Sequence, residues 1–419
     1  MRKAISVLLC LIALASAFAF FRFAVVNPIR DSKRSDSGDF LAFYMAAYRL
    51  SRGEDIYDLR ATRIQARSMG IHKGPPEITY PPFSIVPFVP LTYIFPPVQA
   101  FQFVVIFYAV LYWAALPLLF HAFRLPFTFD SLCIGIIVFS LYTPAWGTID
   151  TGQINMVVLI FVSIGLVFIR RRKDGLAGTA FGLATVAKLF PGIAAIEFLI
   201  QRRYRSIVAM ILVGISILAA SLAIGGTKPY KRFISEELPH NMGVVHAGVH
   251  DISAKSFVHR VFVNGRIKGP HDYRLSLTHR YSRIAVFTFA AISLVILLLG
   301  AKQRRYIPLR ICLLLTLMLI ISPWTWTHHL VMALPCLAAV IAYALRERGG
   351  IRIWMTVSAS VSYILMAIGY KFHIRVHPGD SMRELIQSSS LNLYGVIILF
   401  SMIAVIIIRL RKSGISSSE

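Results

Sequence analysis

The sequence lacks the short motifs that hold nucleotides and catalytic metals in many soluble enzymes. Its 419 residues contain no GxGxxG, no GxxxxGK[ST], no HExxH and no pair of CxxC sequences. These are the local signals for a dinucleotide, for ATP phosphates, for a catalytic zinc and for a zinc ribbon. A mechanism driven by ATP or by a sugar nucleotide therefore has no evident place in this chain, and the sequence predicts no cofactor.

Cysteine and acidic residues are also scarce. The four cysteines (Cys10, Cys133, Cys312 and Cys336) lie far apart inside apolar runs, which is typical of small buried side chains rather than disulfides or metal ligands. The chain has only 19 acidic residues but 44 Lys and Arg, so its formal net charge is +25. In a soluble protein this surplus would suggest nucleic acid. Here most basic residues form short clusters between apolar runs, as in the cytoplasmic loops of membrane proteins, so membrane lipids are the expected partner and nucleic acid is not.

Long apolar runs dominate what is present. The chain is 57% hydrophobic and has a mean hydropathy of +0.67. A helix of about 20 apolar residues crosses a bilayer. Such runs, some of them shorter, fall at 4–26, 81–95, 97–120, 130–146, 154–169, 176–200, 206–225, 283–301, 308–322, 328–345, 351–370 and 391–408. The sequence therefore predicts an all-α polytopic membrane protein, a single integral membrane domain over residues 1–419 with about 11–13 transmembrane or re-entrant helices.

The basic clusters orient these runs. We expect Arg170–Lys173, Arg202–Arg205, Lys302–Arg305, Arg346–Arg352 and Arg409–Lys412 to be cytoplasmic. Alternate crossings then place residues 322–329, 371–390 and a large second loop, 226–282, on the extracytoplasmic side. Six histidines of that loop show no metal-ligand spacing, so a solvated loop is predicted. The first run is long for a cleaved signal peptide, which favours an uncleaved first helix.

Two segments do not fit simple alternation. Residues 174–201 have basic clusters at both ends, and their centre reads Ala187-Lys-Leu-Phe-Pro-Gly192. A lysine at the centre of a spanning helix would cost about 2.5–3.5 kcal/mol, and the proline would break the helix. Two half-helices meeting near Lys188 at a wet cavity avoid both problems. Counting the crossings between the oriented loops also predicts that the short, proline-rich segment 81–95 is re-entrant or only marginally spanning.

The first extracytoplasmic loop, 27–79, carries a candidate acid. Apolar residues recur at spacings of three and four between Phe40 and Leu50, which predicts an amphipathic helix on the membrane surface. Ser37-Gly38 reads as a helix start, which places Asp39 in the first turn, where the helix dipole favours a carboxylate. Asp39 alone is equally well explained as a helix cap.

Four polar sites should then reach one face of the membrane: the Asp39 loop, Gly147–Asn155, the Lys188 tip and Ser322–His329. Each has a plainer reading. Lys188 could be a salt-bridged lysine, and tryptophans such as Trp326 suit an interfacial belt as well as a sugar platform. His328 and His329 are adjacent, so on a helix they diverge by about 100°. One site histidine beside one packing histidine is therefore expected.

Five ordered motifs resemble bacterial polyprenyl-phosphate-mannose-type glycosyltransferases of family 87, which have the GT-C membrane fold. The first is Asp39-Phe-Leu-Ala-Phe-Tyr44-Met-Ala-Ala47 with Gly53 and Tyr57-Asp58. It is followed by Tyr80-Pro-Pro-Phe83, Gly152-Gln-Ile-Asn155, Ala187-Lys-Leu-Phe-Pro191 and Ser322-Pro-Trp-Thr-Trp-Thr-His-His329. Thr325 stands where the family has serine. Lys255–Arg260 is similar to a loop element of the family, but it is short.

The resemblance implies a multi-pass protein of the bacterial inner membrane that performs an inverting transfer outside the cytoplasm. A hexose, by default mannose, would leave a polyprenyl phosphate for a hydroxyl of a lipid or glycan acceptor. Asp39 would be the general base. The remaining roles implied are donor phosphate binding by Lys188, His328 and His329, and sugar or acceptor binding by Tyr44, Gln153, Asn155 and Trp326. The resemblance demands no metal, although first-loop aspartates could supply oxygens.

Two other classes of function stay open. A transporter or flippase of lipid-linked sugars would also need an intramembrane lysine, but such proteins often carry paired broken helices in their two halves, and no partner to the Lys188 segment is evident. A non-catalytic scaffold explains poorly why the polar motifs gather on one predicted face.

Overall fold

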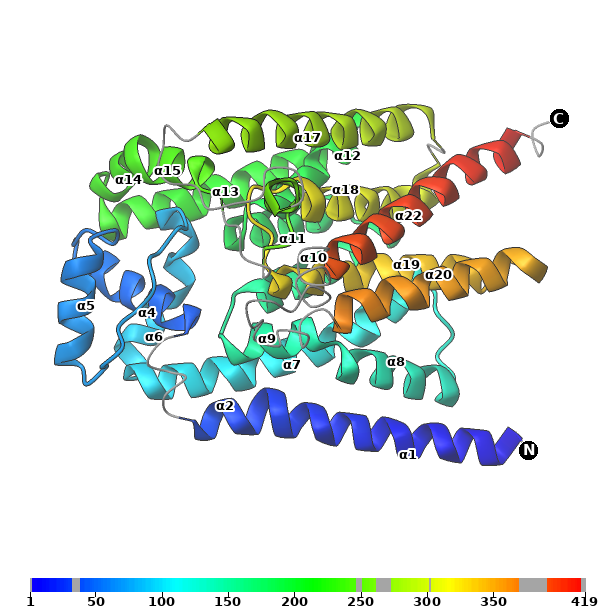
Figure 1. The fold of residues 1–419 in the computed structure, drawn as a ribbon, viewed down its shortest axis with the longest axis horizontal. Helices are drawn as coiled ribbons and strands as arrows, with labels where there is room; N and C mark the ends of the chain where they lie inside the picture. The colour runs from blue at the N-terminus through cyan, green and yellow to red at the C-terminus, as the bar shows by residue number, and fades with distance from the viewer. Residues whose placement is uncertain are drawn as a thin grey trace.

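The computed structural model describes residues 2–31, 38–245, 251–260, 273–300, 303–368 and 390–415. Within these ranges the regular structure is helical, apart from one isolated bridge between Asp251 and Trp326. The two termini lie at one end of the molecule, and the short helices of the two large loops lie at the other (Figure 1). The predicted fold class, an all-α polytopic membrane protein, is confirmed.

The described residues contain seven helices that are long and apolar enough to cross a membrane, or eight if one bent pair counts as a span. The seven are Lys3–Arg30 (α1, Arg2–Phe20, with η1, Phe21–Val26, and α2, Asn27–Arg30), α7 (Pro97–Phe123), α13 (Tyr204–Gly225), Leu275–Leu299 within α17 (Tyr273–Leu299), Thr327–Ala344 (η8, Thr327–Met332, with α19, Ala333–Ala344), α20 (Gly349–Ile368) and Leu391–Arg411 within α22 (Leu391–Ile415). The bent pair is α8 (Phe129–Leu141) and α9 (Thr143–Asp150), which meet at 54°. Pro144 at the start of α9 accounts for this break.

Shorter helices fill the interior. They include α10 (Asn155–Arg170), α11 (Asp174–Ala187), α12 (Ala194–Ile200) and α18 (Ile307–Ile321). The side chains of α18 are almost all buried, including Arg310, whose Nε donates to Glu197 Oε1 of α12 at 2.6 Å. By contrast, only 6% of the most apolar window of α13 is buried, so α13 faces lipid while α18 forms the core.

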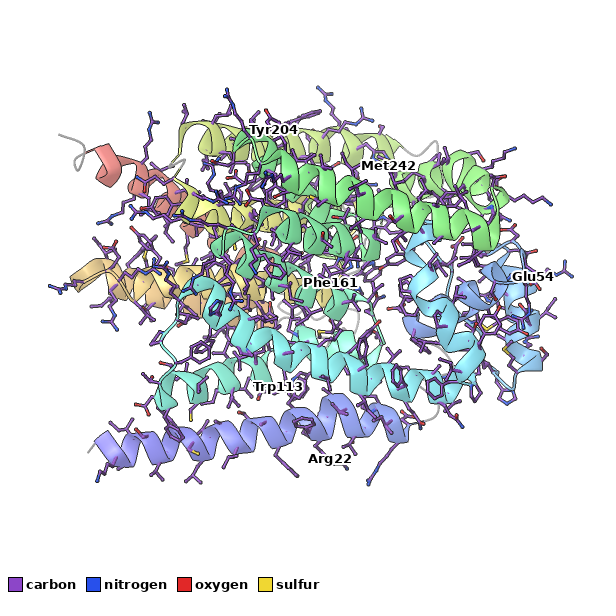
Figure 2. All side chains as sticks on the ribbon, turned by 180° about the vertical axis from the view of Figure 1, so that it is seen from behind. Arg22, Glu54, Trp113, Phe161, Tyr204 and Met242 are labelled. Atoms are coloured by element: carbon purple, nitrogen blue, oxygen red, sulfur yellow. The ribbon has the colours of Figure 1, made fainter. Side chains whose placement is uncertain are left out.

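The two large loops meet at one end of the molecule. The first contains α4 (Asp39–Leu50) and α5 (Leu59–Ser68); the second contains α14 (Lys228–Arg232), η5 (Phe233–Glu237), α15 (Leu238–Gly243) and α16 (Ala254–Val258). Figure 2 shows Glu54 of the first loop and Met242 of the second at this end. Arg232 joins the loops through an ion pair with Asp55 and a 3.4 Å hydrogen bond to the carbonyl of Tyr57.

The first loop departs from prediction in one respect. The helix begins at Asp39 after Gly38, as expected, but α4 is buried on nearly every side instead of lying amphipathically on the membrane surface. It packs against α5, α6 (Val89–Ile94) and α7. The apolar periodicity is real, but the residues between its positions are also mostly apolar or small, which is the pattern of a buried helix.

Both predicted interruptions are present. Helix α11 ends at Ala187, Lys188 is extended with φ −156° and ψ 127°, and the chain resumes as η4 (Phe190–Ile193) and α12. Residues Pro82–Ile94 form η2 (Pro82–Ser84), η3 (Val86–Phe88) and α6, too short to cross a bilayer. The hydroxyl of Ser84 donates to the carbonyl of Val186 at 2.7 Å, which fastens the two interrupted segments together.

The second loop also differs from the sequence expectation. Asp251–Ser256 are buried rather than solvated, and the ring of His259 is buried against the hydroxyl of Thr278, 2.8 Å away. Helix α17 begins at Tyr273, ahead of the apolar run predicted from 283, because its polar first turns contact α16. Of the loop histidines, His246, His250 and His271 lie outside the described residues.

The Gly178–Gly182 pair lets α11 approach α13. A Cβ on Gly178 would lie 2.1 Å from the backbone oxygen of Ser206, closer than any real contact. We expect Gly178→Ala to lower the free energy of unfolding by about 1–3 kcal/mol, because backbone must move apart. Thermal unfolding in detergent measures this. Gly214→Ala on α13 is the control: its Cβ meets open space, so stability should be unchanged or slightly higher. Equal effects of both substitutions would refute the close approach.

Candidate functional site

Asp39 meets Gln153 at the start of α4. The amide Nε2 of Gln153 donates to Asp39 Oδ2 at 2.6 Å, and the backbone N–H of Phe40 donates to the carbonyl of Thr151 at 3.0 Å. Residues from the first loop and from the turn between α9 and α10 are thus joined by side chain and backbone together. The predicted approach of the Asp39 loop to Gly147–Asn155 is present in the structure.

Gly152 makes this contact possible. Its φ of +65° lies in the left-handed region, and a Cβ at this position would lie 2.5 Å from Cβ of Phe40. Glycine is the residue that meets both requirements without strain. Gly152 therefore allows the backbone geometry that brings Gln153 to Asp39.

Lys188 emerges from the end of α11 into a set of polar groups. Its Nζ donates to Asn155 Oδ1 at 3.0 Å, forms a hydrogen bond with His329 Nε2, and lies 5.6 Å from the ring centroid of Tyr80. When Lys188 is protonated, its ammonium has no acceptor, so Nε2 of His329 then accepts and the ring proton of His329 is on Nδ1. The negative charge of Asp39 also acts on Lys188.

The side-chain amide of Asn155 connects three segments of the chain. Its Oδ1 accepts from Lys188, and its Nδ2 donates to the backbone carbonyl of His328 at 3.2 Å. The hydroxyl of Thr148 donates to the same carbonyl at 3.1 Å. Asn155 is fully buried, so both ends of its amide are used to hold protein groups in place.

Tyr80 links the acid to the lysine. Its hydroxyl donates to Gln153 Oε1 at 3.4 Å, while its ring lies beside Nζ of Lys188 and packs edge-on against Phe43 at 4.8 Å. The motif Tyr80–Phe83 is therefore part of the same cluster, although the sequence did not single out Tyr80 as a site residue.

Of the adjacent histidines, His329 presents a ring nitrogen to Lys188, whereas His328 contributes its carbonyl to Asn155 and Thr148. The two rings are nearly perpendicular, at 78°, with centroids 4.6 Å apart. His329 thus contacts Lys188 through its ring and His328 contacts Asn155 through its backbone, while the division into one site histidine and one packing histidine stays a prediction.

Tyr44 and Trp326 make other contacts. The hydroxyl of Tyr44 donates to the carbonyl of Phe95 at 2.9 Å, and its ring packs against Phe40. Trp326 is partly buried and pairs by its backbone with Asp251. The structure therefore brings together Asp39, Gln153, Asn155, Lys188 and His329, with His328 joined through its backbone.

Asp251 is a residue that the sequence reasoning missed. Its Oδ1 accepts from the backbone N–H groups of Ser253 at 2.9 Å and Thr325 at 3.2 Å, and the N–H of Ile252 donates to the carbonyl of Thr325 at 2.7 Å. This contact fixes the segment that leads into His329. The signal available in sequence was the short likeness of Lys255–Arg260, which begins four residues later.

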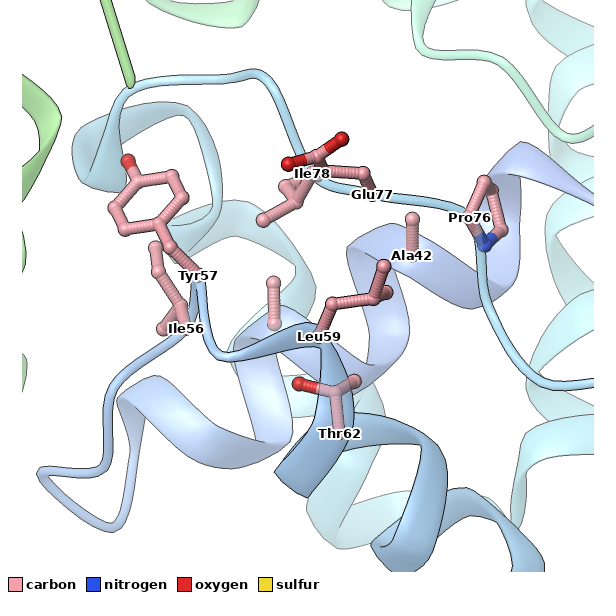
Figure 3. Close-up of a pocket in the computed structure, with 9 residues that line it drawn as sticks. Ala42, Ile56, Tyr57, Leu59, Thr62, Pro76, Glu77 and Ile78 are labelled. Carbon is pink, nitrogen blue, oxygen red and sulfur yellow. The ribbon is translucent and has the colours of Figure 1, made fainter. Parts of the chain in front are cut away.

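A shallow cavity of about 240 Å³, a volume that includes open solvent, lies beside α4 (Figure 3). Ala42 and Ala46 line one side, and the segment Pro76–Ile78 lines the other. Ala42 and Ala46 follow Asp39 by three and seven residues, so all three share one face of the helix. Asp39 itself is not among the residues that line this cavity.

Burial raises the pKa of Asp39 above its ordinary value, while the hydrogen bond from Gln153 and the charge of Lys188 oppose this effect. A partly desolvated carboxylate with an elevated pKa is a better proton acceptor than a solvated one. Among the described residues, no three His, Cys, Asp or Glu side chains gather as a metal site would require.

The fold and this polar centre define a membrane protein in which a partly buried carboxylate and a lysine lie within one cluster. Residues 79–323 match the sequence model of glycosyltransferase family 87. That match covers more than half of the chain, so the chain belongs to this family and is a multi-pass membrane glycosyltransferase. No curated protein and no solved structure matches it.

The contact between Asp251 and Thr325 generates a local prediction. Asp251→Ala removes the acceptor of the Thr325 N–H, so exchange of amide hydrogens at 322–329 should accelerate about tenfold, the equivalent of about one hydrogen bond. Hydrogen–deuterium exchange with mass spectrometry measures this. Asp251→Asn is the matched control, because its Oδ1 can still accept both bonds, and it should exchange like the wild type. Unchanged exchange in Asp251→Ala would show that Asp251 does not hold this segment.

Proposed function

We propose that this glycosyltransferase moves a hexose, by default mannose, from a polyprenyl phosphate to a hydroxyl of a lipid or glycan acceptor. The reaction would take place at the extracytoplasmic side of the bacterial inner membrane, with inversion at the anomeric carbon. The observation that carries the proposal is the joining of Asp39 and Lys188 in one polar cluster through Gln153 and Tyr80, with Asn155 holding Lys188.

Asp39 suits the role of general base. One of its oxygens is held by Gln153, and the carboxylate is only partly buried, so the other oxygen can receive the proton of an acceptor hydroxyl. The acceptor oxygen then bonds to the anomeric carbon while the bond from that carbon to the phosphate oxygen breaks.

Lys188 suits the opposite role. Negative charge develops on the polyprenyl phosphate as it leaves, and a preorganised cation stabilises such charge most in a site that excludes water. Lys188 is held by Asn155 and His329, which we assign to positioning and, in the case of His329, also to the phosphate. Gln153 would orient the base, and His328 would contribute through its backbone. A direct sugar contact by Tyr44 or Trp326 remains a hypothesis from family resemblance.

The donor's chemistry suits the architecture. An isoprenoid chain can stay in lipid beside exposed apolar helices while the phosphate reaches the polar cluster. The interrupted segments at Lys188 and at Pro82–Ile94 bring polar groups to that depth, since irregular backbone in a membrane protein is tolerated where it lines protein or water. A flippase of lipid-linked sugars would also use these features but would not require Asp39 as a base.

The decisive comparison is between two aspartates of the first loop. Purified protein, polyprenyl-phosphate-linked mannose and lipid extract are incubated, and label transfer is followed. We expect Asp39→Asn to reduce transfer at least 100-fold, because the base is lost. Asp58→Asn should retain it, because Asp58 caps α5 through the N–H of Ala61 and asparagine caps equally well. Equal transfer by Asp39→Asn and wild type would remove Asp39 from this role.

The pH dependence tests the same carboxylate. A base must be ionised, so transfer should fall as pH falls through the pKa of Asp39, which burial places above that of a solvated aspartate. The hydrogen bond from Gln153 lowers this pKa, so Gln153→Ala should move the acid limb of the kcat/KM profile to higher pH. A profile of Gln153→Ala that loses rate at every pH without moving its midpoint would contradict the assignment.

A further inference from the structure

Three helices run from the candidate site to the opposite end of the molecule. Helix α7 begins at Pro97, α10 begins at Asn155 of the site, and α19 begins a few residues after His329. Helix α7 packs against both α10 and α19. A helix advances about 1.5 Å per residue, so the 27 residues of α7 cover about 40 Å, enough to reach the other membrane surface.

Arginines gather where these three helices end. The Nε of Arg171 donates to the ring nitrogen Nε2 of His121 at 3.3 Å, and Arg346 donates to the carbonyl of Phe123 at 3.2 Å. The positive charges of Arg124, Arg171 and Arg346 all act on Arg170. We call this group the arginine cluster; its members are Arg124, Arg170, Arg171 and Arg346.

In the part of the chain that the structure describes, no carboxylate pairs with this cluster. Among the ion pairs of the described residues, none joins a member of the cluster to Asp or Glu. Glu347 is next to Arg346 in sequence but lies 4.0 Å from Arg409, and Asp174 pairs with Arg203 and Arg304 instead. Four guanidinium groups brought together without a counter-charge repel one another, and an anion that accepts several of their N–H bonds would relieve this repulsion.

Backbone geometry shows that arginine is present at Arg124 despite a cost. Arg124 has φ 57° and ψ 41°, the left-handed conformation that ends helix α7, and Leu125 N–H donates to Phe120 O as in a Schellman motif. Glycine is the usual residue at such a position, and a residue with a Cβ costs about 1 kcal/mol more. Glycine would therefore suit this position, so Arg124 can be replaced there without backbone strain.

We propose that the arginine cluster binds the phosphate headgroup of an anionic phospholipid at the membrane surface opposite the candidate site. Apolar side chains at the same place favour a lipid over a soluble phosphate. Phe127, which packs on Phe120, and Leu345, beside Arg346, are 58% and 43% exposed. Cations beside exposed apolar groups match a ligand with a charged head and acyl chains. The proposal does not depend on the transferase chemistry.

Native mass spectrometry of the full-length protein in neutral detergent tests this assignment. Phosphatidylglycerol is titrated into the wild type and into Arg124→Gly/Arg171→Gln. Each arginine near an anionic headgroup contributes about a fivefold gain in affinity, so the double variant should bind about 30-fold more weakly. Glycine suits the left-handed backbone at position 124, and thermal unfolding without lipid should show that the variant remains folded.

Arg202→Gly/Arg205→Gln is the matched control. Arg202 also ends a helix in the left-handed conformation, with φ 54°, and both residues are exposed, but its neighbour Arg203 pairs with Asp174. This variant should bind phosphatidylglycerol like the wild type. Equal weakening in both variants would overturn the specific site. Binding of phosphatidylcholine or of soluble glycerol 3-phosphate as tight as that of phosphatidylglycerol would overturn the assignment to an anionic lipid.

Discussion

An ammonium group inside an apolar helical bundle must be surrounded by partners, and Lys188 imposes this constraint on the structure around it. A charge buried without partners costs several kcal/mol, so the helix ends at Ala187 and the side chain enters a polar cluster. Asn155, His329 and the ring of Tyr80 come from three other segments to meet it. Each of those segments belongs to a motif that would otherwise have no evident reason to be polar at membrane depth.

The two large loops complete the centre. The first places Asp39 against Gln153 by virtue of Gly152, and the second fastens the segment before His329 through Asp251. Arg232 then ties the two loops to each other through Asp55. Asp39 and His329 are thus held in place by parts of the chain that are distant in sequence. The proposed glycosyl transfer would benefit from such preorganisation, because groups already in place lower the entropic cost of bringing two reactants together.

The sequence allowed much of this fold to be predicted, because hydrophobic length and basic clusters report directly on membrane crossings. The break at Lys188 followed from the cost of a central lysine next to proline. The burial of α4 was missed because the prediction rested on its amphipathic spacing, whereas the residues between those positions are also mostly apolar or small, as in a buried helix. Asp251 was missed for another reason: its partner Thr325 is 74 residues away, and a pairing between loops leaves no periodic trace. The role of Asn155 likewise became visible only when both ends of its amide were seen to be occupied.

The central claim is that the donor phosphate and the acceptor hydroxyl meet between Lys188 and Asp39. A cryo-EM structure of the protein with a bound polyprenyl-phosphate sugar tests it most directly. The account predicts phosphate oxygens within hydrogen-bond distance of Lys188 Nζ, and the Asp39 carboxylate on the face of the anomeric carbon opposite the phosphate. A phosphate bound away from Lys188, or a sugar whose anomeric carbon faces away from Asp39, would contradict it.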